Sequence, residues 1–277
     1  MKCTAFAEYY DSKISYNHFL YTDMSWEGIE AQTHQAFEII FVKKGDLTYV
    51  VNEKMYNVKD NSLILTRPNK THIIYFNKCD YERYDIIFNT SIIHPEIYNS
   101  FPENLDVISL ENTSGFAETF EKLDLFCNHF KDDALKKVLS DVIEEIFYYI
   151  YACASTHSKE ISLNNYETDS LLSKSMRYIE KNLTSIISLE QMCSELYISK
   201  SYLHRIFAKH LQTTPKKYIT ARRLALAQKA LQGDAKPTDV YAKCGFSDYS
   251  AFYRCYLKHF GYPPSKELDK TVIRIKY

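Results

Sequence analysis

The chain has 277 residues, 45% of them hydrophobic and 25% charged, which is typical of a soluble globular protein with one large domain or two ordinary ones. Its net charge of −1 hides an asymmetry: residues 170–277 carry 19 Lys and Arg against 8 Asp and Glu, or +11, leaving −12 for residues 1–169. We therefore expect only the basic part to dock on a polyanion such as nucleic acid. The seven cysteines are scattered without a CxxC pair, so neither a zinc site nor a disulfide framework is indicated.

No basic segment followed by an apolar run opens the chain, so no signal peptide is visible. The longest apolar stretch, Ile143–Ala154, is interrupted by Glu144 and Glu145 and is too short to span a bilayer. The sequence therefore predicts a cytoplasmic protein with no membrane partner.

Short strands are predicted over residues 34–92. The stretch from Phe37 to Val58 is rich in β-branched and aromatic residues and is broken by turn-forming residues at Lys43–Asp46 and Asn52–Lys54. Further strand-like runs cover Ser62–Leu65, His72–Asn77 and Tyr84–Phe88. Strands at intervals near ten residues predict an antiparallel β-sandwich or small β-barrel.

A helical hairpin is predicted over about residues 113–154. Apolar residues repeat at helical spacing from Phe116 to Phe130 and again from Leu135 to Tyr149, with a break at Lys131–Asp133. The hairpin either covers the barrel only, or also pairs with another subunit through the outer part of its second helix.

Residues 155–168 are polar, lack an apolar rhythm and lie where the charge balance reverses. They are the predicted linker between an N-terminal domain of residues 1–154 and an all-α domain of residues 169–277. The predicted fold class is therefore α+β.

The all-α domain contains the same unit twice: a short helix, a turn, and a second helix with an apolar seam and an arginine on its outer face. The first copy runs from Ser188 to His210 and the second from Lys236 to Phe260. A helix that begins at Pro215 and ends near Gly233 joins them. Helix-turn-helix units of this size place their second helix in the DNA major groove.

The outer face of each second helix carries short or hydrogen-bonding side chains opposite the apolar seam. This suits a groove-reading helix, because arginine can bind guanine bidentately and serine or histidine can reach bases or phosphates. The alternative is a solvated outer face on a helical bundle. The predicted DNA-contacting residues are Lys200, Ser201, Tyr202, His204 and Arg205 in the first copy and Tyr249, Ser250, Tyr253 and Arg254 in the second.

Residues from about Tyr178 to Glu267 resemble the AraC/XylS-type transcriptional regulators. The motifs that carry the resemblance are SLEQMCSELYISKSYLHRIFAKH, LALAQKAL and GFSDYSAFYRCYLKHFGYPPSKE. The resemblance implies a seven-helix DNA-binding domain whose two reading helices enter successive major grooves on one side of the duplex. By position, the residues that correspond to base- or backbone-contacting ones are Ser201, His204, Arg205, Ser250 and Arg254.

Two positions depart from the family's pattern. Tyr197 lies in the first turn where glycine is common, and a residue held there at positive φ would cost about 1 kcal/mol. Tyr241 replaces a small residue where the two helices of the second copy approach each other closely. Both departures concern the details of the turn and of the helix spacing.

The strand-rich part resembles the two motifs of the cupin barrel, as His34-x3-Glu38-x6-Gly45 and Asn61-x6-Pro68-x3-His72. Cupin enzymes hold a metal with three histidines and a glutamate, but here Gln32 replaces the first histidine and Asn61 replaces a glycine. With only two imidazoles present, we expect no metal and no other cofactor.

In regulators of this family, the barrel is often a pocket for a small effector such as a sugar or another metabolite. The resemblance implies that His34, Glu38 and His72 project into that pocket. Tyr49 and Tyr75 are expected to line it with them, because apolar walls with a few polar groups suit small-ligand sites.

These patterns predict a sequence-specific DNA-binding regulator and not an enzyme. It is expected to be an effector-responsive activator that binds a double-stranded operator as a homodimer and works with RNA polymerase. Two alternatives stay open on the sequence: a cupin-type metal-dependent enzyme fused to a DNA-binding domain, and a regulator whose barrel is an unliganded scaffold.

Overall fold

The computed structural model describes residues 2–24, 30–51, 54–77, 79–103, 105–110, 115–156, 171–185, 188–233 and 235–269. Its strands are β1 (Lys2–Tyr10), β2 (Ile14–Met24), β3 (Glu30–Gln32), β4 (Phe37–Lys44), β5 (Leu47–Val51), β6 (Lys54–Val58), β7 (Ser62–Thr66), β8 (His72–Phe76), β9 (Cys79–Phe88) and β10 (Val107–Ser109). Its helices are α1 (Pro95–Ser100), α2 (Phe116–His129), α3 (Asp132–Thr156), α4 (Leu171–Lys181), α5 (Leu189–Glu195), α6 (Lys200–Leu211), α7 (Pro215–Leu231), α8 (Pro237–Lys243) and α9 (Tyr249–Phe260), with 3-10 turns η1 (Thr90–Ile92) and η2 (Pro264–Asp269). A strand-rich part followed by a helical part confirms the predicted α+β class.

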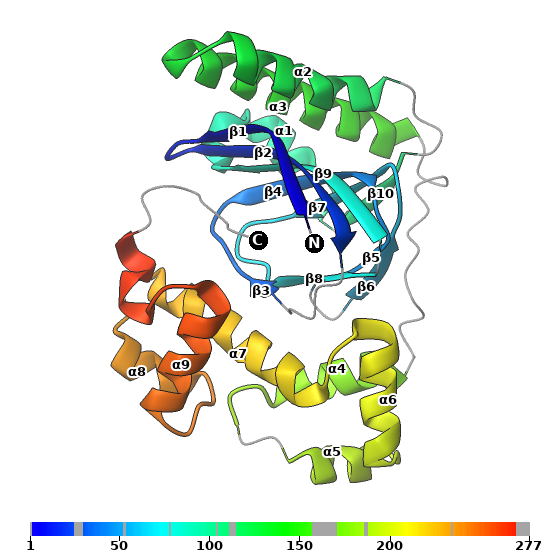
Figure 1. The fold of residues 1–277 in the computed structure, drawn as a ribbon, viewed down its shortest axis with the longest axis vertical. Coiled ribbons are helices and arrows are strands. Elements are labelled where there is room, and N and C mark those ends of the chain that lie inside the picture. Colours follow the sequence, from blue (N-terminus) through cyan, green and yellow to red (C-terminus); the bar gives the residue numbers. More distant parts are fainter. Residues whose placement is uncertain are drawn as a thin grey trace.

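The strands form two antiparallel sheets that pack face to face (Figure 1). The six-stranded sheet has the order β1-β2-β9-β4-β7-β10, and the four-stranded sheet has the order β3-β8-β5-β6. Apolar side chains from both sheets, such as Ile40 and Ile64 from one and Tyr49 and Ile74 from the other, share one interior core. Strands β1 and β2 were not predicted, because polar residues such as Asn17 face this interior and interrupt the apolar pattern.

The predicted helical hairpin is present as α2 and α3, which lie along the outer face of the six-stranded sheet (Figure 1). Strand alternation turns Phe37, Ile39 and Phe41 of β4 outward to this hairpin, where they join a core that includes Phe120 and Phe147. Burial of these aromatic and aliphatic side chains fixes the hairpin on the barrel. The predicted linker lies mostly outside the described residues, which resume at α4.

The four-stranded sheet turns its outer face to the helical half of the chain (Figure 1). Val50, Met55 and Ile73 of the barrel lie in one buried cluster with Met176 of α4 and Tyr218 of α7. Hydrogen bonds cross the same boundary: the Thr33 amide donates to Oε1 of Gln228 (3.3 Å), and Nε2 of Gln232 donates to the Thr33 carbonyl (3.3 Å). The barrel and the helical half are therefore docked through α7, which the sequence did not indicate.

Four helices of the helical half, α5, α6, α7 and α9, begin after residues whose side chains cap them. The side chains that accept a backbone N–H at the first turn are Ser188, Ser199, Thr214 and Asp248. In α5 the capping box is half formed, because the Gln191 side chain donates to Glu195 instead of reaching back to Ser188. Among the described residues, no helix combines the length and the apolar character that crossing a membrane requires.

Candidate functional site

The first helix-turn-helix unit consists of α5 and α6. One face of α6 is buried in the core through Leu203, Ile206 and Phe207, and the opposite face is solvated. Of the predicted contact residues on this helix, Lys200, Ser201 and Arg205 are exposed, whereas Tyr202 and His204 are half-buried. The second helix of the unit thus has one buried and one solvated face, as its sequence indicated.

On the exposed face of α6, Arg205 and Lys200 each contact one neighbouring side chain. The Arg205 guanidinium carbon lies 4.9 Å from the centre of the Tyr202 ring, so the aromatic face holds the charge by a cation–π contact. The Lys200 ammonium lies 2.5 Å from Oε1 of Glu190 on α5. Both side chains are exposed, so this ion pair is weak and Lys200 stays accessible to other partners.

The second unit consists of α8 and α9. Phe252 and Tyr256 are buried, and Ser250, Tyr253 and Arg254 are exposed. Tyr249 is half-buried and packs against Phe252 with a centroid distance of 6.0 Å, so it also contributes to the core of this unit.

The large residue at Tyr241 is accommodated by aromatic packing. Its ring meets that of Tyr249 edge-on, with centroids 5.8 Å apart and an interplanar angle of 78°. An edge-to-face pair is a favourable aromatic geometry. The pair therefore explains how the second unit accepts tyrosine where the family has a small side chain.

Helix α7 joins the two units and carries basic residues that are structural. Arg222 makes a two-pronged contact with the Glu180 carboxylate (2.5 and 2.8 Å), and Arg223 donates to the carbonyls of Leu183 (2.9 Å) and Ser185 (2.6 Å). These contacts lock α4 to α7. Seventeen residues give α7 a length of about 25 Å, and it lies between the first unit and the second (Figure 1).

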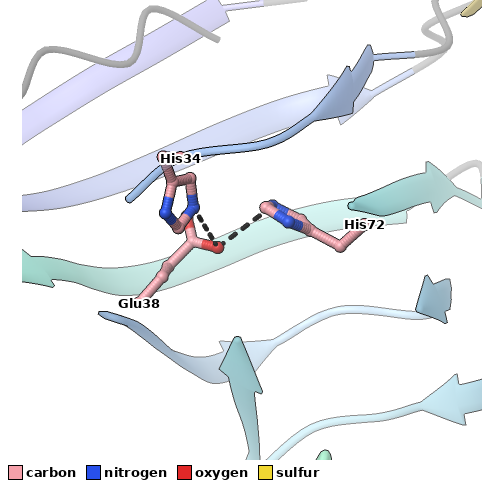
Figure 2. A group of neighbouring side chains, drawn as sticks. All are labelled: His34, Glu38 and His72. Carbon is pink, nitrogen blue, oxygen red and sulfur yellow. Dashed lines mark ion pairs between the residues drawn. The ribbon is translucent and has the colours of Figure 1, made fainter. Parts of the chain in front are cut away.

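In the barrel, His34, Glu38 and His72 converge on one point (Figure 2). Oε2 of Glu38 lies 3.5 Å from Nε2 of His34 and 3.1 Å from Nε2 of His72. The segment before β4 supplies His34, β4 supplies Glu38, and β8 supplies His72. Sequence analysis placed these three residues together, and the geometry brings them within 4.8 Å of one another.

Burial and charge act against each other in this cluster. Burial alone would lower the pKa of His34, but the hydrogen bond and negative charge of Glu38 outweigh it and raise that pKa. Burial likewise opposes ionisation of Glu38, yet the charge on His72 and the hydrogen bond from His34 hold the pKa of Glu38 well below its usual range. The cluster is therefore an anionic carboxylate held between two imidazoles.

Of the two tyrosines expected to line the pocket, only Tyr49 faces the interior. Its hydroxyl shares a 2.8 Å hydrogen bond with Oγ1 of Thr66, and its ring centre lies 6.1 Å from that of His72. The expectation for Tyr75 is wrong. It lies three residues after His72 on β8, so the alternation of a strand turns it to the opposite face, where it is buried with Tyr218 of α7.

Sequence analysis missed a buried charged pair in the barrel. Arg83 and Asp85 of β9 are fully buried, and Nη1 of Arg83 lies 3.3 Å from Oδ2 of Asp85. They alternate with Tyr84 and Ile86, which face the hairpin core, so both charged residues point to the interior. The signal was available, since two charged residues at alternating positions, here Arg83 and Asp85, lie on the same face of a strand.

Comparisons with known proteins match both halves of the chain. The model of an AraC-like ligand binding domain matches residues 18–97, and that of a helix-turn-helix domain matches residues 192–270. The HTH-type transcriptional regulator GbdR from Pseudomonas aeruginosa is 29% identical over 132 residues, covering 47% of this chain and 36% of its own length. The chain thus matches only about a third of the length of that relative.

Two other similarities extend over most of the chain. The HTH-type transcriptional activator RhaS from Escherichia coli is 20% identical over 248 residues, covering 83% of this chain and 84% of its own. A crystal structure of ToxT from Vibrio cholerae covers 93% of this chain and 98% of its own, with a TM-score of 0.40 and 13% identity. The matched family consists of regulators, so a cupin-type enzyme is not supported. The chain belongs to the AraC family of DNA-binding transcriptional regulators, with an AraC-like ligand-binding domain ahead of its helix-turn-helix domain.

Proposed function

We propose that this protein is a sequence-specific regulator that reads two successive major grooves with α6 and α9. The observation that carries the proposal is the pair of exposed polar faces on these helices, Ser201 with Arg205 and Ser250 with Arg254. Each face lies opposite a sealed apolar face, and α7, which is about 25 Å long, joins the two units. Entry into successive major grooves would place the two helices one duplex turn, about 34 Å, apart.

Affinity and selectivity then have different sources. The excess of Lys and Arg in residues 170–277 supplies salt-dependent phosphate contacts, and the two outer faces supply base selectivity. RhaS is named an activator, and we propose that this chain also activates transcription, in the cytoplasm and in contact with RNA polymerase.

The proposed homodimer has a candidate surface on the hairpin. Leu125 of α2 and Tyr148 and Tyr151 of α3 are large hydrophobic side chains with exposed fractions of 52%, 54% and 43%. Apolar groups of this size favour burial against a partner, and aromatic residues are enriched in interfaces. A second copy of the chain is the partner that we propose for this surface.

We also propose that a small effector binds in the barrel near His34, Glu38, Tyr49 and His72. The docking of the barrel on α7 gives such an effector a direct route to the reading helices. Thr33 precedes His34 and is held from both of its backbone groups by Gln228 and Gln232 of α7. An effector that shifts this segment would therefore bias the position of α7 through its differential binding to two states.

The groove-reading proposal is tested by selecting bound sequences from a random DNA pool and then measuring the affinity of single variants. Arg205→Ala and Arg254→Ala should each lose about 1–3 kcal/mol of binding to the selected site and relax base preference at one position. Lys229→Ala, which removes an exposed cation from α7, should weaken binding to selected and random DNA equally. If the two arginine variants behave like Lys229→Ala, these arginines contact phosphates only and do not read bases.

The effector proposal is tested by repeating the selection with and without an extract of cell metabolites. A metabolite that binds in the barrel should change either the affinity or the spacing of the selected half-sites. If no extract fraction changes DNA binding or the thermal stability of the full chain, the barrel is an unliganded scaffold.

A further inference from the structure

The barrel cluster has the donor set of a metal site. His34, Glu38 and His72 have exposed fractions of 9%, 0% and 1%, and each turns one donor atom to a common point (Figure 2). Two imidazole nitrogens and one carboxylate oxygen are ligands that divalent transition metals prefer.

The backbone fixes which imidazole nitrogens are available. Nδ1 of His34 lies 2.8 Å from the carbonyl oxygen of Ala36, and Nδ1 of His72 lies 3.4 Å from that of Lys70. A carbonyl oxygen can only accept, so each Nδ1 donates its proton to the backbone and Nε2 is the ring nitrogen that faces Glu38. A metal ion would bind both Nε2 atoms in place of any proton that they carry. Such backbone partners of Nδ1 are also the usual supports of metal-bound histidines.

The two imidazole nitrogens lie farther from Glu38 than in a strong charge-assisted hydrogen bond. A charge-assisted N–H···O bond is about 2.7–2.9 Å long, whereas the two nitrogens lie 3.1 and 3.5 Å from Glu38 Oε2. Donors bound about 2.1 Å from one ion at angles of 90–109° lie about 3.0–3.4 Å apart. The separation from His72 lies within this second range and that from His34 lies slightly above it. All three donor atoms lie within 4.8 Å of one another, so an ion bound to all three would draw them closer together. We propose, against the expectation from the sequence, that His34, Glu38 and His72 bind one first-row divalent transition metal ion such as Zn²⁺.

The surroundings complete such a site. Gln32 is buried and pairs in register with His72 across β3 and β8, which places its side chain on the same face of the sheet. Its amide oxygen is a further donor where many metal sites have a third imidazole.

This inference goes beyond DNA recognition and does not depend on it. An ion held by His34, Glu38 and His72 would cross-link the start of β4 to the start of β8, at one end of the barrel. It should therefore stabilise the folded chain. Three protein ligands of this kind leave coordination positions open for water or for an oxygen donor of a small molecule.

The test uses the full chain after removal of metal with a chelator. Titration with Co²⁺, whose d–d absorption reports coordination by nitrogen and oxygen, should saturate at one ion per chain and raise the melting temperature. Zn²⁺ should displace Co²⁺. His72→Ala and Glu38→Gln should weaken Co²⁺ binding at least about tenfold and abolish the thermal shift.

His18→Gln is the matched control. His18 is also a buried histidine beside carboxylates, but its Nδ1 contacts Asp124 (2.7 Å) and its Nε2 contacts Glu82 (3.2 Å), so its donors do not converge. This variant should bind Co²⁺ as the unaltered chain does. Absence of saturable Co²⁺ and Zn²⁺ binding by the unaltered chain, or equal binding by His72→Ala, would overturn the proposal. Because Glu38→Gln is nearly isosteric, it retains a readout if His72→Ala fails to fold.

Discussion

The two helix-turn-helix units contain the same turn with different residues. In each, the first helix is followed by one residue near φ −90° and one at positive φ, namely Tyr197 (φ 55°) and Gly245 (φ 84°). The next amide in each turn, that of Ile198 or Phe246, donates to a carbonyl five residues earlier at 3.0 or 3.1 Å. This is the pattern of a Schellman helix end, which glycine favours.

The surroundings of the turn explain why only one unit has glycine. A Cβ at Gly245 would lie 2.7 Å from Nε of Arg223 and 2.8 Å from the Leu183 carbonyl, at the joint between α4 and α7. The Tyr197 side chain is 95% exposed. The comparison teaches that the space outside the turn, more than its backbone, decides which residue is tolerated.

The two units also differ in what encloses their cores. The first unit shares its core with Ile73 and Tyr75 of the barrel, whereas Val240, Phe252 and Tyr256 of the second unit close a cluster with α7 that contains no barrel residue among those described. We therefore expect the orientation of the first unit to depend on the barrel more than that of the second.

The largest loss of stability is expected from Ile73→Ala, which tests whether the first unit depends on the barrel more than the second does. Ile73 is fully buried against the first unit, and removing its side chain should lower the free energy of unfolding by about 2–5 kcal/mol. Amide hydrogen exchange should accelerate in α4 to α7 and stay unchanged in α8 and α9.

Its matched control is Ile74→Ala on the same strand. Ile74 faces the barrel interior, so its truncation should destabilise the barrel without accelerating exchange in α4 to α7 at equal loss of stability. Identical exchange patterns for the two variants would show that the first unit does not depend on the barrel surface.

Local patterns predicted much of this molecule. Period-2 repeats predict the strands from Phe37 onward, and period-3.6 repeats predict the hairpin, α6 and α9. Capping residues mark the starts of α6 and α9. The hydrogen bond between Thr33 and Gln228 joins residues 195 positions apart, so no local sequence pattern could predict it. The inward direction of Arg83 and Asp85 and the outward direction of Tyr75 could have been predicted, because the alternation of side chains along a strand assigns each of them to a face.

A smaller effect is expected from Gly245→Ala. Alanine at this φ costs about 1 kcal/mol, and the close contacts to Arg223 and Leu183 add about 1–2 kcal/mol, so the free energy of unfolding should fall by about 2–3 kcal/mol. Gly261→Ala is the control, since it has φ 76° with nothing within 4 Å of the added Cβ and should lose only about 1 kcal/mol. Equal losses in urea denaturation would show that backbone conformation alone selects glycine.

The smallest effect is expected from Tyr197→Gly, which relieves the same conformation in the first unit. Glycine adopts φ 55° without the Cβ penalty, and the exposed tyrosine ring has little packing to lose, so stability should rise by up to about 1 kcal/mol. Tyr197→Ala separates the two contributions, because it removes the ring but keeps a Cβ at positive φ and should bring no gain. Urea denaturation of both variants decides the matter. A gain that is equal for alanine and glycine would place the strain in the tyrosine side chain, and a loss for glycine would mean that the entropy of the unfolded chain outweighs the strain at this turn.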